Sequence, residues 1–332
     1  MKIERGVCMK MKKETIIKLM GILLLAVSVA ITTPSGRTTD ALSVGILQLI
    51  EHASLDAVRD GFIEGLAANG FENGNQIELT YLNAQGDQSN LRVMSQQLVS
   101  NHADLIFAIA TPSAQAVANA TNEIPVLTGA VTDLVSANLV ESNEIPNTNV
   151  SGTSDMTPVE KQLDLLLQLA PNTQTLGFLY NSSEANSQIQ VEIAEEYARK
   201  LGLKTERMTV TNTNDVTQNM IALIQRVDAI YIPTDNTLAS AMPNVGAIAR
   251  EYQIPVITGA IEMAVEGGLA TVGIDYYQLG KQAADMAIRV FNGEDISQMS
   301  VELASEAHIV INEEMALAIG LTLPDELQNI KE

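Results

Sequence analysis

The sequence contains few cysteines, histidines, aromatic residues and basic residues, and these shortages exclude several classes of protein. Its single cysteine, Cys8, lies ahead of the first hydrophobic run, so a disulfide framework and a thiolate metal cluster are excluded. The three histidines show neither HxxxH nor HExxH spacing, which argues against a zinc enzyme. The 19 Lys and Arg against 40 Asp and Glu give a net charge of −21. This charge argues against nucleic acid or an anionic membrane surface as partners.

Catalytic motifs are missing as well. The GxSxG, P-loop, GxGxxG and HExxH patterns do not occur, and no cysteine follows the hydrophobic run to pair with a histidine. We therefore expect neither an enzyme nor a bound cofactor or metal, although a hydrolase built from Asp, Ser and a lone His stays open as an unsupported alternative. The length of 332 residues and a charged fraction of 18% fit two ordinary globular domains.

The first 40 residues have the pattern of an export segment followed by a spacer. A basic stretch precedes an apolar run at residues 19–31, which as a helix would span about 20 Å, less than the ~30 Å hydrocarbon core of a bilayer. Ser28 and Ala30 supply the small residues of a cleavage site. We expect an exported, extracytoplasmic protein that is either secreted after cleavage near Ala30 or kept at the cell surface by an uncleaved N-terminal anchor.

From residue 41 onward, short apolar strands alternate with amphipathic helices, which indicates parallel sheets covered on both faces. Strands are expected at residues 42–47, 77–82, 103–110, 125–127, 176–180, 205–210, 229–233, 255–258 and 270–274. Helices are expected at residues 55–69, after a cap at 87 or 89, from 111, and at 189–201, 216–226 and 238–252.

The two halves of this pattern repeat one another. The segment Ile-Pro-Val-Leu-Thr-Gly-Ala at residues 124–130 recurs as Ile-Pro-Val-Ile-Thr-Gly-Ala at 254–260, at the same place in the same order of elements. Two doubly wound lobes are therefore expected. Ligands of such sheets bind at the carboxyl ends of the strands, so two facing lobes form a cleft that can close by a hinge motion.

Six segments stand in an order that is specific to one family: residues 45–48, 110–115, 129–133, 151–154, 179–181 and 232–236. With the export segment and the two lobes, they resemble the tryptophan/tyrosine-type solute-binding proteins of ABC importers, over residues 41–330. Many such proteins carry a lipid-anchored cysteine just after the apolar run. Here Cys8 precedes the run, so no lipid attachment is assigned.

The resemblance implies a type I periplasmic-binding-protein-like fold, in which two doubly wound parallel-sheet lobes are joined by a three-strand hinge. Lobe 1 would comprise residues 41–152 and 275–300, and lobe 2 residues 153–274 and 301–332. The crossings would lie near residues 150–155, 272–278 and 299–304. By the same analogy, residues 279–291 form a helix of lobe 1 and residues 307–311 a strand of lobe 2.

The function implied by the resemblance is the binding of an aromatic amino acid (tryptophan, phenylalanine or tyrosine) for an ABC permease and its ATPase, by a monomer whose lobes close on the ligand. Another small amino acid, a peptide or a carboxylate is the alternative ligand, and a receptor-linked sensor is an alternative role. An effector domain of a transcription regulator would need a helix-turn-helix where the export segment stands.

The repeat also suggests ligand-binding residues, because Thr111 of one half aligns with Asp235 of the other. Thr111 and Ser113 begin a helix whose free amides suit the ligand α-carboxylate. Asp235 would accept the ligand ammonium, with Asn236 beside it. Both positions can equally well be helix caps, without any ligand.

The remaining candidates are weaker. Asp275 is a second possible ammonium acceptor or a hinge hydrogen-bonding residue, and the adjacent Tyr276 could stack on a ligand ring. Further candidates for contacts are Gln48, Thr132, Asn181 and Glu184, although some of these positions can be ordinary turn residues. No ligand role is assigned to His52 or His102.

Overall fold

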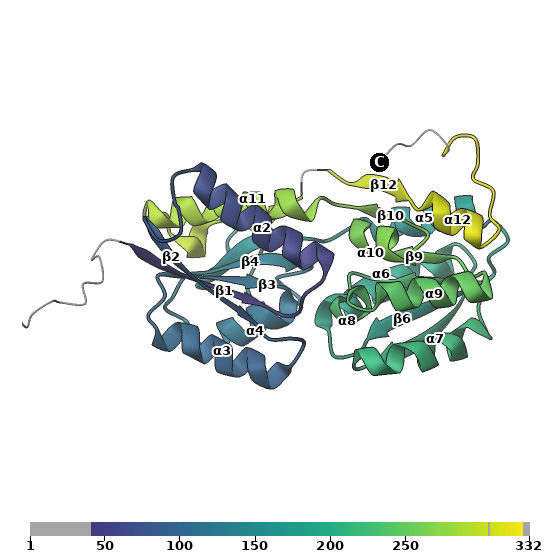
Figure 1. Ribbon diagram of the computed structural model, residues 1–332, viewed down its shortest axis with the longest axis horizontal. Helices are drawn as coiled ribbons and strands as arrows, with labels where there is room; N and C mark the ends of the chain where they lie inside the picture. Colours follow the sequence, from purple (N-terminus) through teal and green to yellow (C-terminus); the bar gives the residue numbers. More distant parts are fainter. Residues whose placement is uncertain (1–40, 305, 328–332) are drawn as a thin grey trace, which may run out of the picture. The chain divides into compact units, whose positions relative to one another are not determined.

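The computed structural model describes residues 41–304 and 306–327, and it contains two six-stranded sheets (Figure 1). The expected export segment, with its cleavage point near Ala30, lies outside the described residues. Among the described helices, none combines the length and the apolar character needed to cross a membrane.

The first sheet, which defines lobe 1, has the strand order β11-β5-β4-β3-β1-β2, and every neighbouring pair is parallel. Its strands are β1 (Leu42–Gln48), β2 (Ile77–Asn83), β3 (Leu105–Ile109), β4 (Val126–Val131), β5 (Val150–Ser154) and β11 (Glu302–Leu303). Helices cover both faces, and the central strands are therefore buried throughout. One face carries α2 (Ala53–Ala68) and α11 (Tyr276–Phe291), and the other carries α3 (Gln88–Ser100) and α4 (Thr111–Ala118) (Figure 1).

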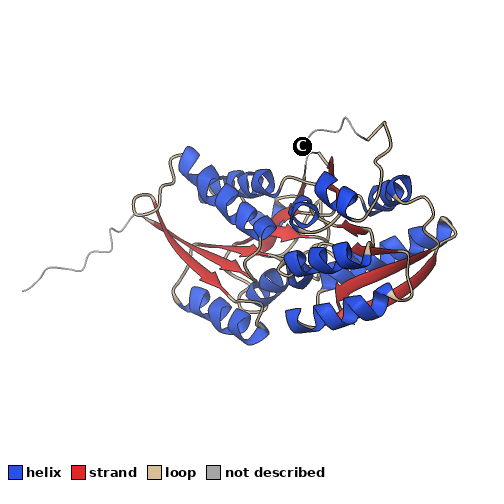
Figure 2. Ribbon diagram, turned by 45° about the vertical axis from the view of Figure 1, so that its right-hand side comes forward, coloured by secondary structure: helices blue, strands red, loops and turns tan. Residues whose placement is uncertain are grey.

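The second sheet defines lobe 2 and has the order β12-β10-β9-β8-β6-β7, with β12 antiparallel to β10 and the other pairs parallel. Its strands are β6 (Thr175–Asn181), β7 (Lys204–Val210), β8 (Ala229–Ile232), β9 (Val256–Thr258), β10 (Ala270–Gly273) and β12 (His308–Ile311). Its helices are α5 (Val159–Leu169), α6 (Ala185–Lys200), α7 (Val216–Ile224), α8 (Asn236–Ala239), α9 (Met242–Tyr252), α10 (Ile261–Glu266) and α12 (Glu313–Ala318), with short 3-10 turns at Thr213–Asp215 and, in lobe 1, Ile296–Gln298. Helices and strands largely alternate along the chain in both lobes, and Figure 2 shows helices on either side of the strands.

The expected fold of two doubly wound lobes is confirmed, with corrections at particular boundaries. The helix expected at 238–252 is two helices, α8 and α9, because Pro243 in the first turn of α9 cannot continue a preceding helix. Strand β5 continues to Ser154, and β11 pairs with it at residues 302 and 303. The expected starts of lobe 2 at residues 153 and 301 therefore fall two to three residues too early.

The backbones of helices α2 and α11 approach each other so closely that the contact positions have room only for glycine. A Cβ atom added to Gly280 of α11 would lie 2.1 Å from the carbonyl oxygen of Val58 on α2, and one added to Gly61 would lie 2.1 Å from that of Tyr277. This contact attaches α11, which arrives from lobe 2, to lobe 1. Beneath it, the rings of Phe62 and Phe107 stack with their centroids 3.9 Å apart.

The substitution Gly280→Ala tests this contact. Alanine normally stabilises a helix interior relative to glycine by roughly 0.5–1 kcal/mol. Here the methyl group meets backbone of α2, so we expect the free energy of unfolding to fall by about 1–3 kcal/mol in urea titrations. Asp285→Ala, at an exposed position of α11, is the control and should change it by less than about 0.5 kcal/mol. A Gly280→Ala protein as stable as the parent would contradict the close packing.

Candidate functional site

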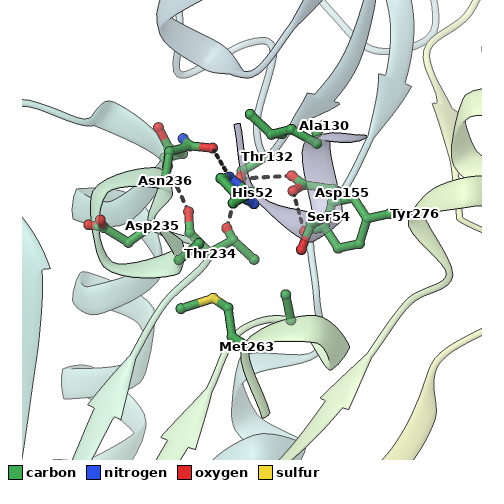
Figure 3. A pocket seen from close by; sticks show the side chains of 14 residues that line it. His52, Ser54, Ala130, Thr132, Asp155, Thr234, Asp235, Asn236, Met263 and Tyr276 are labelled. Carbon is green, nitrogen blue, oxygen red and sulfur yellow. Dashed lines mark hydrogen bonds between the residues drawn. The ribbon is translucent and has the colours of Figure 1, made fainter. Parts of the chain in front are cut away.

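The carboxyl ends of strands from both lobes meet at a pocket (Figure 3). In this arrangement the cavity has a volume of about 20 Å³, which is room for about one water molecule, so a ligand the size of an amino acid requires the walls to move apart. Its wall is formed by the loop into α2, the end of β4, the hinge, the loop after β8 and the start of α10. The structure therefore has a pocket at the strand ends between the two lobes, where the sequence predicts a ligand site.

Gln48, at the end of β1, holds the loop that enters the pocket from lobe 1. Its buried side-chain amide donates to the carbonyl of Ile50 and to Asp56 Oδ1, both at 2.8 Å, and its Oε1 accepts from Tyr81 at 3.2 Å. The next residues of this loop, His52 and Ser54, line the pocket. Gln48 is thus a support of the site and not part of its wall.

Three hydrogen bonds join the lobes across the pocket. His52 Nε2 lies 3.2 Å from Asn236 Oδ1, and the hydroxyls of Thr132 and Thr234 lie 3.2 Å apart (Figure 3). At the pocket edge, Ser54 donates to Glu262 Oε2 of α10 at 2.8 Å. The two lobes are therefore in a closed arrangement around the pocket.

Two buried carboxylates, Glu184 and Asp235, lie side by side on lobe 2. Asp235 caps α8 through Leu238 N at 2.9 Å and also accepts from Asn181 N and Ser187 Oγ. Burial is the main cause that raises the pKa of Asp235, to about 8, and the nearby Glu184 charge adds to it. The capping role that the sequence left open for Asp235 is therefore real, while its side chain also lines the pocket.

A third buried carboxylate, Asp155, follows β5 at the hinge. Its Oδ1 accepts from Thr132 at 2.9 Å, and its Oδ2 accepts from the hydroxyl of Tyr276 at 2.7 Å (Figure 3). Burial raises its pKa, and these hydrogen bonds only partly oppose the effect. Because Asp155 has two side-chain donors and lines the pocket, its carboxylate keeps acceptor capacity for a further group.

The pocket region has several buried carboxyl groups and, among the described residues, no ion-paired cation to balance their charge when they ionise. Asp155, Glu184 and Asp235 are each at most 3% exposed, and burial also raises the pKa of the half-buried Glu262. None of the ion pairs found among the described residues includes these four carboxylates. Such a site favours a ligand that supplies a positive charge.

The start of α4, which follows β3 next to β4, has unsatisfied donors. The hydroxyls of Thr111 and Ser113 are buried without a hydrogen-bond partner in the described part of the chain. Ala110, which precedes them, and Ala130, in the pocket wall, have φ of 80° and 55°, in the left-handed region that disfavours alanine. Strained backbone and unpaired donors at a helix N-terminus are features of ligand sites.

Only some of the residues predicted from the sequence lie in the pocket wall. Those in the pocket wall are Thr132, Asp235, Asn236 and Tyr276. Asn181 and Glu184 lie outside the wall but hydrogen-bond to residues in it, whereas the buried Thr111 and Ser113 are not among the pocket residues. Asp275 is exposed and caps α11 through Gln278 N, so the hinge hydrogen-bonding alternative describes it and its expected place at the ammonium is not supported by position.

Sequence reasoning missed two central residues, His52 and Asp155. His52 received no role because a lone histidine carries no spacing signal, although it follows β1 just as Asn236 follows β8. Asp155 directly follows the segment 151–154 at a predicted lobe crossing, and that position was the available signal. The apolar Met263, for which the sequence suggests no role, also lines the pocket.

The chain was compared with known families and structures. The family model described as "ABC transporter substrate binding protein" matches residues 43–331. A tyrosine-binding protein of Clostridioides difficile is 40% identical over 279 residues, which cover 84% of this chain and 81% of that protein.

Two solved structures add information about conformation. An ABC domain in complex with L-Trp, from Streptococcus pneumonia, has a TM-score of 0.85 at 39% identity, covering 87% of this chain and 98% of that one. A ligand-free, open substrate binding protein with adhesive properties from Clostridium difficile has a TM-score of 0.67 at 44% identity, covering 88% and 98%.

The raised pKa of Asp235 predicts how stability depends on pH. A carboxyl group holds its proton more tightly in the folded protein when its folded pKa is raised. Its contribution is therefore fully present below the unfolded pKa of 3.8 and is lost as the pH rises towards about 8. We expect Asp235→Asn to reduce the fall in unfolding free energy between pH 5 and pH 8.5 by at least about 1 kcal/mol. The exposed Asp285→Asn should leave this slope unchanged in urea titrations, and an equal slope for Asp235→Asn would refute the assignment.

Proposed function

The chain belongs to the family of ABC transporter substrate-binding proteins, and we propose that it binds an aromatic amino acid in the pocket between its lobes. The observation that carries this proposal is the group of buried carboxylates without a protein cation. The tyrosine-binding protein and the L-Trp complex, at 40% and 39% identity, support an amino acid with an aromatic ring as the ligand.

The ammonium group of the ligand binds at the hinge side of the pocket. Asp155 is the better acceptor, since its carboxylate is buried, lines the pocket and accepts side-chain hydrogen bonds from Thr132 and Tyr276 while keeping acceptor capacity. Asp235 already accepts three hydrogen bonds within lobe 2, and its raised pKa makes it the weaker counter-charge. An ammonium between these carboxylates offsets the cost of burying them.

The α-carboxylate binds at the start of α4. The unpaired hydroxyls of Thr111 and Ser113 are donors, and the helix N-terminus adds a partial positive charge. The ligand ring then packs against the apolar part of the wall, to which Leu55, Met263 and Ala260 contribute. The two charged ends of the amino acid are thereby held by different elements, which makes a zwitterion a better ligand than a simple acid.

Ligand binding favours the closed arrangement of the lobes. The chain superposes better on the L-Trp complex than on the open, ligand-free relative, although it is more identical to the latter. The cross-lobe contacts of His52, Ser54 and Thr132 form only when the lobes meet, so a ligand that contacts both lobes shifts the population towards closure.

The closed, liganded form acts outside the cytoplasm as a monomer and delivers its ligand to an ABC permease and ATPase, without chemical change of the ligand. The proposal includes export of the protein, which is then either attached to the cell surface or secreted, as residues 1–40 lead us to expect. A sensor that signals to a membrane receptor is the second role, since it would use the same closed clamp.

A fluorescence titration tests the ligand class. The chain contains no tryptophan, so emission excited in the indole band comes from added L-tryptophan alone. We expect a saturable shift of this emission, with tyrosine as a competitor. Asp155→Asn should weaken binding by about 10- to 100-fold, because the ammonium loses its charged acceptor. The matched control is Asp275→Asn, since Asp275 is exposed and outside the pocket.

Two results would overturn this proposal. Absence of saturable binding for all three aromatic amino acids would remove the ligand class, and a wider thermal-shift screen would follow. Wild-type affinity in Asp155→Asn would remove the assigned acceptor while leaving the ligand class in place.

A further inference from the structure

A chain of hydrogen bonds runs from Glu184 through Asn236 to His52. Glu184 Oε2 accepts from both the backbone N–H and the side-chain amide of Asn236, and its Oε1 accepts from Thr237 N at 3.1 Å. Both oxygens of Glu184 face backbone N–H groups, which can only donate, so both oxygens act as acceptors here. The NH₂ group of Asn236 must therefore face Glu184, and the orientation of this amide is fixed.

This orientation determines the state of His52. With the amide nitrogen of Asn236 on Glu184, its Oδ1 is the atom that faces His52 Nε2, at 3.2 Å. A carbonyl oxygen cannot donate, so Nε2 must carry the hydrogen. Burial lowers the pKa of His52, and the ring is neutral at pH 7. A neutral ring with its proton on Nε2 has a bare lone pair on Nδ1.

The chemistry of the ligand leaves one group for this lone pair. The ammonium goes to the buried carboxylates, and a ligand carboxylate would be repelled by a lone pair. Among aromatic amino acids, the remaining polar groups are the indole N–H of tryptophan and the O–H of tyrosine, whereas phenylalanine has none. Both are donors, and the bare Nδ1 of His52 in the pocket wall is an acceptor that matches them.

We propose that His52 selects tryptophan and tyrosine over phenylalanine by accepting a hydrogen bond from the ligand ring at Nδ1, and that Glu184 is the positioning residue that fixes the required tautomer through Asn236. This inference rests on the proposed function, since it specifies the ligand within that class. A pocket that supplies a hydrogen-bond partner discriminates strongly against a ligand that lacks the matching group.

Competition titrations against L-tryptophan test the selector. Phenylalanine should bind the parent protein at least about tenfold more weakly than tryptophan and tyrosine. His52→Leu should abolish this ratio by weakening tryptophan and tyrosine while changing phenylalanine by less than about threefold. His308→Leu, at an exposed position of β12, should keep the parental ratio. An unchanged ratio in His52→Leu, or equal binding of all three ligands by the parent, would overturn the proposal.

The positioning role has a readout that does not depend on binding. The protein has only three histidines, so imidazole ¹⁵N spectra resolve each ring, and His52→Leu identifies the His52 signals. We expect the Nε2–H tautomer at His52 in the parent and a mixture of tautomers in Glu184→Gln, whose amide no longer dictates the orientation of Asn236. Glu184→Gln should also lower the tryptophan-to-phenylalanine ratio.

The outcomes separate this inference from the ligand class. One outcome is that no aromatic amino acid binds, while His52 is the Nε2–H tautomer in the parent and a mixture of tautomers in Glu184→Gln. The proposed function and the role of His52 in ligand selection then fail, but the positioning of His52 by Glu184 stands. If tryptophan binds and His52 is an Nδ1–H tautomer or unaffected by Glu184→Gln, the proposed function stands and this inference fails.

Discussion

The burial of several carboxyl groups at the lobe interface without a paired cation among the described residues is the constraint on which the site depends. Asp155, Glu184 and Asp235 are buried close to one pocket, and the ion pairs among the described residues leave all three unpaired with a cation. Hydrogen bonds from Thr132, Tyr276 and neighbouring amides reduce the cost of burying this charge but do not remove it. A ligand ammonium supplies the missing charge, and closure around it is thereby linked to binding.

The fold brings these groups together because it is built twice from the same unit. In each lobe the strands run parallel, so their carboxyl ends and the following loops gather at one edge. The hinge adds Asp155 and Tyr276, whose side chains meet at 2.7 Å although 121 residues separate them. The close packing of α11 on α2 fixes Tyr276 relative to lobe 1, so hinge and site share one support.

The sequence allowed prediction of the fold and of four of the 14 residues in the pocket wall, namely Thr132, Asp235, Asn236 and Tyr276. The repeated segment at 124–130 and 254–260 predicts both lobes, and three of the candidates predicted near strand ends, Thr132, Asp235 and Asn236, line the pocket. His52 and Asp155 were not predictable from residue type, because their roles arise from contacts across the cleft. The place of Asp155 also depends on the shifted β4–β5 register, where Gly152 approaches the backbone of Thr128 too closely for a side chain.

Calorimetry with three indole compounds tests the central claim that the pocket requires a ligand cation. L-Tryptophan carries both charged groups, tryptamine lacks the carboxylate, and indole-3-propionate lacks the ammonium. We predict that indole-3-propionate binds at least about 100-fold more weakly than L-tryptophan, because the buried carboxylates stay unpaired, and that tryptamine retains measurable affinity. Binding of indole-3-propionate as tight as that of L-tryptophan would contradict the account.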